Sequence, residues 1–348
     1  MNSTTSHHDP VTGDAATISD VARLAGVSIS TVSRVVNGTA PVSGAVAARV
    51  EAAMQTLNYV PRAAARNLAS RRSHTLGLLL AVSSGDYFGP LLAGVEGVAA
   101  EHGYDLLVST AGRLGPQSDL PRSLGRHNTD GVLVFAGCLT ADALRHLHTG
   151  GARVVLVHAS APEGLNIPCV TIENKAAARA AVEHLIEAHG RHRVVLLRGP
   201  DDQEDSHWRE RGYRQAHIRH GLDIDPALCV PGDFNHEIAE RSVARLLAEG
   251  VPFDGIFTGD DDAAVGALRA LHAAGVRVPE DVAVVGFDDQ RLAAALTPPL
   301  TTVRAPTEEV GAEAARQLIA LIEQRPVQPV TLLPTTLVHR RSCGCFGV

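Results

Sequence analysis

Hydrophobic and polar positions change their period near residue 75. After this point short, continuous apolar runs recur, and segments with helical periodicity lie between most of them; the runs are 75–82, 105–110, 131–137, 153–159, 193–199, 255–259 and 282–288. Buried strands that alternate with helices are typical of parallel sheets covered on both faces. Since the runs are too many for one small sheet, we predict two similar doubly wound α/β subdomains.

Before residue 75 the pattern predicts three short helices. Each follows a residue suited to be its N-cap: 18–25 follows Thr17, 29–36 follows Ser28, and about 44–57 follows Ser43. The third helix has one apolar stripe, formed by Val46, Val50, Ala53, Met54 and Leu57.

The first two helices have the spacing of a helix-turn-helix. Gly26 permits a tight turn, Ala22 is small where the helices cross, and Val32 fills the space between them together with Val21 and Val35. The second helix then leaves Ile29, Ser30, Ser33 and Arg34 free to face a major groove. A generic helical hairpin would fit the turn as well, but the hydroxyl-rich face favours DNA binding.

Charge is distributed unevenly along the chain. Residues 17–75 contain seven arginines against Asp20 and Glu51, a net charge of +5. Since the whole chain carries −7, the remainder carries −12. A basic head on an acidic body suggests that the head binds a polyanion, although a solvated basic helix would give the same balance.

Two segments of the first region are unsuited to independent folding. Residues 1–16 are polar and aperiodic, so we expect a disordered tail. Residues 62–70, after Pro61, have helical propensity but almost nothing to bury except Leu68, so we expect this segment to fold only against a partner.

Several classes of function lack support in the sequence. No apolar run is long enough to cross a membrane and no export signal opens the chain, which indicates a cytoplasmic protein. The five cysteines form no CxxC pair, and Cys343 and Cys345 have no further ligands nearby in sequence, so we expect free thiols and no metal or other cofactor. The P-loop, GxGxxG, GxSxG and HExxH motifs of enzymes are missing.

Several motifs resemble those of the LacI/GalR family of transcription regulators. They include "TISDVARLAGVSISTVSRVVNGT" (17–39), "VSGAVAARVEAAMQTLNYVPRAAARNLAS" (42–70), "GVRVPEDVAVVGFDD" (275–289) and "LVHRRSC" (337–343). The resemblance covers the chain after its tail, in the family's order.

The resemblance implies a division into domains. The head would span 17–60, the hinge helix and linker 61–74, and an effector-binding and dimerisation body 75–341, followed by a C-terminal tail at 342–348. The body resembles periplasmic sugar-binding proteins, with an N-subdomain of about 75–172 and 305–334 and a C-subdomain of about 173–304 and 335–341.

The resemblance also implies which residues contact DNA. Ile29 and Ser30 would set operator preference, Arg34 would donate to guanine or phosphate, and Thr31 and Ser33 would bond phosphates. In the hinge, a leucine enters the minor groove between base steps and a small residue lies at the helix–helix contact. The remaining predicted DNA-contacting residues are Leu68 and Ala65 of the hinge and Thr17, Ser28 and Asn37 of the head.

Open α/β sheets bind ligands at the carboxyl ends of their strands. The effector-binding residues expected there are Tyr87 and Phe88, Trp208 and Arg209, and Asp260 and Asp288. The resemblance implies that the aromatics stack on the effector and that the arginine binds it, although one of the two adjacent aromatics could belong to the core. The triplet at 260–262 could suggest Mg²⁺, but one of its carboxylates suits the N-cap of the next helix. The histidine-rich segment 189–193 is expected to be a solvated loop.

Together these features predict a homodimeric, ligand-responsive transcription regulator, in the family usually a repressor, that binds a near-palindromic double-stranded operator. A sugar or sugar derivative is the expected effector, with a nucleoside or purine corepressor as the alternative. A solute-binding protein or an enzyme on the same scaffold is disfavoured, because neither would need the helix-turn-helix.

Overall fold

The computed structural model describes residues 16–37, 40–59, 72–81, 86–112 and 116–345. The chain folds into two compact units, of which the first ends at Ser73 and the second begins at His74. The predicted hinge helix, with Ala65 and Leu68, lies outside the described residues, as does nearly all of the predicted tail at 1–16.

The first unit contains the three predicted helices, α1 (Ile18–Ala25), α2 (Ile29–Asn37) and α3 (Gly44–Thr56). Their core is small and fully buried, with Val21, Val32 and Val50 at its centre. A core of this size explains why helices too short to be stable alone persist here, since each is covered by the other two.

Local hydrogen bonds fix both ends of α1. The Thr17 hydroxyl accepts from the Asp20 amide while the Asp20 carboxylate accepts from the Thr17 amide, which forms a capping box. Gly26 ends the helix in the left-handed conformation at φ +62°. The Arg49 guanidinium of α3 donates to the carbonyl oxygens of Ala25 and Gly26, so the turn is held to the third helix.

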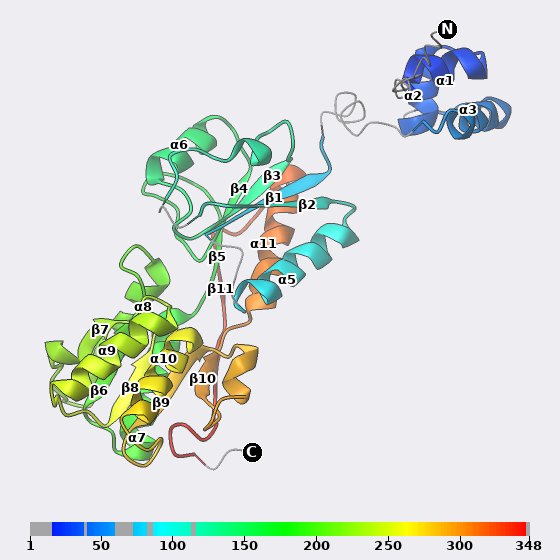
Figure 1. Ribbon diagram of the computed structural model, residues 1–348. Helices are drawn as coiled ribbons and strands as arrows, with labels where there is room; N and C mark the ends of the chain where they lie inside the picture. The colour runs from blue at the N-terminus through cyan, green and yellow to red at the C-terminus, as the bar shows by residue number, and fades with distance from the viewer. Residues whose placement is uncertain (1–15, 38–39, 60–71, 82–85, 113–115, 346–348) are drawn as a thin grey trace, which may run out of the picture. The chain divides into compact units, whose positions relative to one another are not determined.

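The second unit begins with a six-stranded parallel sheet in the order β11-β5-β4-β3-β1-β2. Helices α5 (Phe88–Glu101) and α11 (Thr307–Ile322) pack together against one face, and α6 (Ala141–Thr149) covers the other (Figure 1). The strands are β1 (Thr75–Leu80), β2 (Asp105–Thr110), β3 (Gly131–Phe135), β4 (Val154–Val157), β5 (Cys169–Ile172) and β11 (Val330–Leu333).

A second six-stranded sheet has the order β12-β10-β9-β8-β6-β7 and is parallel except for β12. Its helices form two pairs that contact opposite faces: α7 (Asn174–His189) with α8 (Glu204–Arg219), and α9 (His236–Ala248) with α10 (Asp261–Ala273). The strands are β6 (Val194–Arg198), β7 (Cys229–Pro231), β8 (Gly255–Thr258), β9 (Ala283–Asp288), β10 (Thr301–Arg304) and β12 (Thr336–Val338).

Alternate residues of each strand explain the continuous apolar runs. In β6, Val194 and Leu196 join the core on the α7 side, whereas Val195 and Leu197 join the core on the α9 and α10 side. Both faces of the central strands are therefore buried, as expected for a doubly wound sheet, whereas edge strands such as β2 and β11 keep exposed positions. The predicted fold class, a helix-turn-helix head with two doubly wound subdomains, is confirmed.

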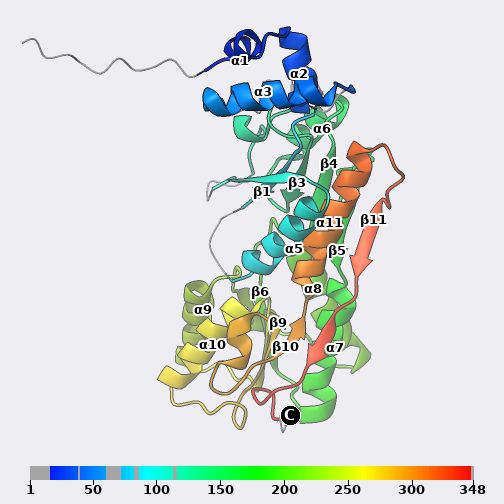
Figure 2. The same cartoon turned by 90° about the vertical axis from the view of Figure 1, so that its right-hand side faces the viewer.

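The chain passes between the two sheets three times. The crossings follow β5, β10 and β11, and the last one joins β11 directly to β12 (Figure 2). We did not predict strands β5, β7, β10, β11 or β12, several of which are interrupted by polar residues. Sheets joined in this way bring the carboxyl ends of their strands to a shared cleft.

Candidate DNA-binding head and effector cleft

The face of α2 that is turned away from the head's core is polar and accessible. Ser28, Ser30 and Arg34 are exposed, Ile29 is 50% exposed, and Thr31 and Ser33 are half-buried. The Ser28 hydroxyl accepts from the Thr31 amide at 3.2 Å, so it caps the helix as predicted. The two remaining predicted contacts of the head are Thr17, with an exposed side chain at the start of α1, and Asn37, the last residue of α2. An apolar face buried beneath an exposed hydroxyl and guanidinium face suits insertion into a major groove.

A cavity of about 660 Å³ lies between the two sheets of the second unit. Aromatic residues line it from the first sheet's side, namely Tyr87, Phe88 and Phe135. Polar and aromatic residues of the second sheet's side complete it, among them Arg209, Phe234, Asp260 and Asp288. Five of the six predicted effector-binding residues therefore border one cavity, because the strands before them end at the same cleft.

Trp208 does not line this cavity. Consecutive helix residues point about 100° apart, so Trp208 and Arg209 of α8 face different sides. The indole of Trp208 borders a neighbouring cavity of about 460 Å³, donates to Glu204 Oε1 at 3.0 Å and lies beneath the Arg211 guanidinium. The structure thus separates two residues that the sequence analysis had grouped in one site.

Arg209 is the central cation of the cleft, and its side chain is almost fully buried. The guanidinium donates to Asn174 Oδ1 at 2.9 Å, to the Gly259 carbonyl and to Asp288 Oδ1 at 3.4 Å. It also lies 3.7 Å from the centre of the Phe287 ring. These contacts hold the guanidinium in one orientation at the floor of the cavity.

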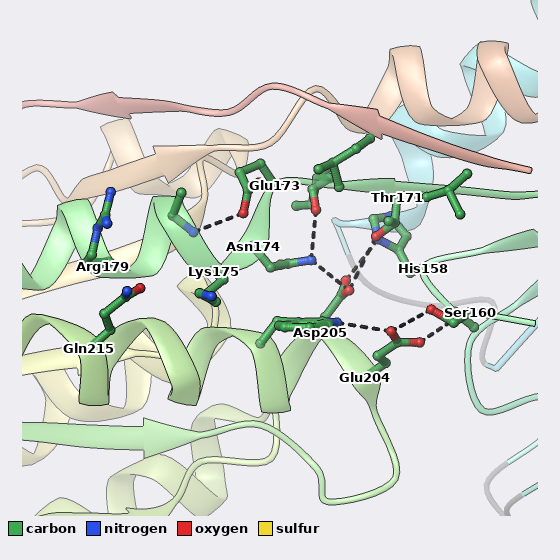
Figure 3. Close-up of a pocket in the computed structure, with 16 residues that line it drawn as sticks. His158, Ser160, Thr171, Glu173, Asn174, Lys175, Arg179, Glu204, Asp205 and Gln215 are labelled. Carbon is green, nitrogen blue, oxygen red and sulfur yellow. Dashed lines mark hydrogen bonds and ion pairs between the residues drawn. The ribbon is translucent and has the colours of Figure 1, made fainter. Parts of the chain in front are cut away.

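Polar contacts join the two subdomains beside Arg209. His158 Nδ1 lies 2.9 Å from Asp205 Oδ2, and the Tyr87 hydroxyl is 2.7 Å from His158 Nε2. Figure 3 shows the Asn174 amide and the His158 imidazole both pointing at Asp205. Since His158 follows β4 and Asp205 belongs to α8, the pair connects the first subdomain to the second.

Ser160 and Glu204 make a second connection. The Ser160 amide and hydroxyl donate to the two Glu204 carboxylate oxygens at 2.6 and 2.7 Å (Figure 3). Both connections lie at the edge of the cleft, where a change in the separation of the subdomains would break or strengthen them.

The cleft carboxyl groups differ in their preference for a proton. Burial and the neighbouring Asp288 raise the pKa of Asp260 to about 8, and burial also raises the pKa of Asp288. Burial opposes ionisation of Asp205 too, but His158, Arg209 and Asn174 outweigh it and lower the pKa of this carboxyl. At neutral pH the cleft therefore offers an ionised acceptor at Asp205 and a largely protonated carboxyl at Asp260.

Four of the eight described non-glycine residues with a positive φ border the two cavities. His158, Asp233, Phe234 and Asp288 have positive φ values of 59°, 50°, 51° and 105° although none is glycine. Each of these residues borders one of the two cavities. Such backbone conformations cost about 1–3 kcal/mol of conformational energy per residue. Strain gathered in this way is typical of a ligand site.

The sequence analysis missed His158 and Asp205, left Asn174 out of the site, and did not consider Phe234. One signal was available: Asp205 and Arg209 are four residues apart on one helix, a spacing that places their side chains on one face. His158 and Phe234 had no such signal, because their loops reach the cleft only through the packing of the two sheets. The N-cap predicted within the acidic triplet is confirmed, since Asp260 caps α10 by accepting from the Ala263 amide at 2.9 Å.

A helix-turn-helix head followed by a two-subdomain body with a polar cleft defines a DNA-binding regulator of the ligand-binding class. Comparison with known families agrees. Residues 17–62 match the model for bacterial regulatory proteins of the lacI family, and residues 182–343 match a periplasmic binding protein-like domain. The chain belongs to the LacI family.

Named relatives extend over nearly the whole chain. It is 37% identical to the ribose operon repressor of Escherichia coli (strain K12) over 328 residues, which cover 94% of this chain and 99% of the repressor. Its fold is similar to that of the lac repressor dimer bound to operator and the anti-inducer ONPF, with a TM-score of 0.82, 27% identity, and 95% and 99% of the two chains covered. It is also similar to the transcriptional regulator CelR–cellobiose complex, with a TM-score of 0.69, 33% identity, and 94% and 99% covered.

Within the described part of the chain, no helix combines the length and apolar character needed to span a bilayer.

Proposed function

We propose that this protein is a transcriptional repressor whose affinity for operator DNA is set by a small molecule bound between the two body subdomains. The observation that carries this proposal is the exposed face of α2, where Ser28, Ser30 and Arg34 lie outside a head core that buries the helix's apolar side. A hydroxyl and a guanidinium can bond base edges and phosphates, and Ile29 can contact a thymine methyl group.

The proposed effector is a sugar or a sugar derivative. The cavity volume of about 660 Å³ falls in the range of small-molecule sites. Arg209 and a protonated Asp260 can donate to hydroxyl oxygens, while Asp288 can accept from hydroxyls. The phenyl rings of Phe88, Phe135 and Phe234 supply apolar surface for a sugar ring. A relative in complex with cellobiose and another named for the ribose operon support this class.

Effector binding would act through the contacts that join the subdomains. An occupant that favours closure stabilises the His158–Asp205 and Ser160–Glu204 pairs, whereas one that favours opening weakens them. A ligand shifts DNA affinity only by its differential affinity for the two states. In a homodimer this would alter how two heads are spaced on a near-palindromic site.

The DNA-binding part is tested by selecting double-stranded sites from a random library with the full chain. We expect one enriched, near-palindromic sequence. Arg34→Ala should lower affinity for it by about 5- to 150-fold, because a bidentate guanine contact contributes about 1–3 kcal/mol. Arg145→Ala on α6 removes the same charge from the body and should leave affinity unchanged. Failure to enrich any site would refute the assignment.

The effector part is tested separately by a thermal-shift screen with ribose, cellobiose, other sugars and purine nucleosides. We expect a sugar to raise the melting temperature, and Arg209→Ala to abolish the shift while the unliganded protein still binds its operator. A response to nucleosides alone would replace the sugar assignment with the purine alternative, since the same phenyl rings can stack on a base.

A further inference from the structure

Four metal-ligating side chains meet at the C-terminal end of α7, opposite to the end of this helix that borders the cleft. His184 and His189 come from this helix, and Cys343 and Cys345 come from the segment after β12. Figure 2 shows this last segment of the chain beside α7. One ligand atom of each lies within 4.8 Å of all the others. We propose that these four residues form a structural Zn²⁺ site.

Four of the six distances between the ligand atoms are close to those around a tetrahedral zinc ion. With Zn–S about 2.3 Å and Zn–N about 2.0–2.1 Å, a regular tetrahedron separates sulfur from nitrogen by about 3.6 Å and two nitrogens by about 3.4 Å. Cys343 Sγ and Cys345 Sγ each lie 3.5 Å from His184 Nε2, and Cys345 Sγ lies 3.5 Å from His189 Nε2. The two imidazole Nε2 atoms are 3.2 Å apart.

The surrounding backbone is shaped to hold these ligands. His189 is the last residue of α7 and is followed by Gly190 in the left-handed conformation, which ends the helix. Between the cysteines, Gly344 has φ +106°, and a Cβ there would lie 3.1 Å from His189 Nδ1. A tight, glycine-dependent turn thus places both thiols on the imidazoles. The predicted solvated loop at 189–193 is wrong in this respect, because His189 is helical and half-buried.

A hydrogen-bond partner lies behind the buried thiol. Thr301 Oγ1 is 3.1 Å from Cys343 Sγ and already accepts from the Arg340 amide at 2.8 Å, so its own proton is free for the sulfur. Such a donor orients and stabilises a zinc-bound thiolate. Ser342 anchors the same segment, since its hydroxyl donates to the Val284 carbonyl at 2.6 Å.

Zinc suits this donor set better than Mg²⁺ or Ca²⁺ does. Two thiolates and two imidazoles in a tetrahedron are the ligands of structural zinc, whereas Mg²⁺ and Ca²⁺ require oxygen ligands. Binding would release the two thiol protons to solvent as Zn²⁺ takes their place. The ion would fasten the C-terminal segment to the helix whose other end, at Asn174, borders the effector cleft.

The test uses the reduced, full-length protein after chelator treatment and titration with Zn²⁺. We expect one zinc per chain, and substitution by Co²⁺ should give the intense visible bands of a tetrahedral thiolate complex. Cys345→Ser and His189→Ala should lower zinc affinity more than about 100-fold, since loss of a partner behind a ligand already costs about 10–100-fold. Thr301→Val removes the hydroxyl behind Cys343. This variant should still bind one zinc per chain, but about 10–100-fold more weakly.

Matched controls separate this site from incidental binding. Cys229→Ser removes a half-buried thiol elsewhere, and His192→Ala removes an exposed imidazole three residues beyond His189, so both should bind zinc as the parent does. The proposal is overturned if the reduced parent binds no zinc, or if both ligand variants retain parental affinity. The proposal is also overturned if a Cys343–Cys345 disulfide forms in air and the protein still binds no zinc after that disulfide is reduced. The cobalt spectrum of the parent decides the question should a ligand variant fail to fold.

Discussion

Replacement of Asp260 by asparagine should stabilise the body of this repressor, and the gain should grow with pH. The Asp260 side chain is only 6% exposed, and its pKa is raised from 3.8 to about 8, chiefly by burial. Asparagine has the same shape and is an equally good N-cap, so its Oδ1 can still accept from the Ala263 amide of α10. The substitution therefore removes the ionisable group and little else.

The pKa fixes the sign and the size of the effect. Between about pH 4 and pH 8 the unfolded chain has lost the Asp260 proton that the folded protein retains, so folding takes up a proton and the free energy of unfolding falls as pH rises. A difference of one in pKa corresponds to about 1.4 kcal/mol. The wild-type protein thus loses about 2 kcal/mol by pH 5, about 4 kcal/mol by pH 7 and about 5 kcal/mol by pH 8, and Asp260→Asn recovers up to these amounts.

Urea unfolding followed by tryptophan fluorescence measures this gain. Trp208 is the only tryptophan of the chain and lies in the same subdomain as Asp260, so its signal reports the relevant unfolding. Asp201→Asn is the control, because that side chain is 78% exposed and its loss should change stability by less than about 0.5 kcal/mol. A variant no more stable than the parent at pH 7, or a gain that stays constant with pH, would refute the reasoning.

Four further substitutions test the packing and one helix cap. Gly94→Ala should destabilise the protein by about 1–3 kcal/mol in the same unfolding assay, because a Cβ there would meet the Glu308 carbonyl of α11 at 1.9 Å. At Gly97 on the same helix a Cβ would meet nothing within 4 Å, so Gly97→Ala should stabilise the protein by up to about 1 kcal/mol. Equal effects of the two would contradict the close approach of α5 to α11. Val32→Ala in the core of the head should abolish operator binding in a gel-shift titration yet leave the effector's thermal shift intact, since the head and the body are separate units. Thr17→Ala removes the capping box and should cost the head about 1 kcal/mol, seen as an earlier loss of helical circular dichroism; an unchanged transition would count against the cap.

Local patterns sufficed for the head. Thr17, Gly26 and Val32 act through neighbours within a few residues, as a cap, a turn and a core residue, so their spacing predicts the first two helices to within one residue of the observed bounds. The apolar stripe after Ser43 predicts the third helix equally closely. Long apolar runs likewise predict seven strands of the body, because a strand covered on both faces needs no polar position. The family resemblance then implied Arg209, Asp260 and Asp288, which do border one cavity.

Contacts between distant segments were beyond such patterns. His158 and Asp205 form a pair only because two separate sheets meet there, and Trp208 turns away from Arg209 because neighbouring positions on a helix point in different directions. The histidines of α7 precede Cys343 and Cys345 by more than 150 residues. They come together only because β12 directs the last segment of the chain toward the end of α7. In this protein the sequence alone determined the three helices of the head, their turn and caps, and seven of the strands, because hydrogen bonding and periodicity act locally. Only the tertiary structure decided which side chains share the cleft and the cysteine–histidine cluster, because those neighbours are chosen by packing across the chain.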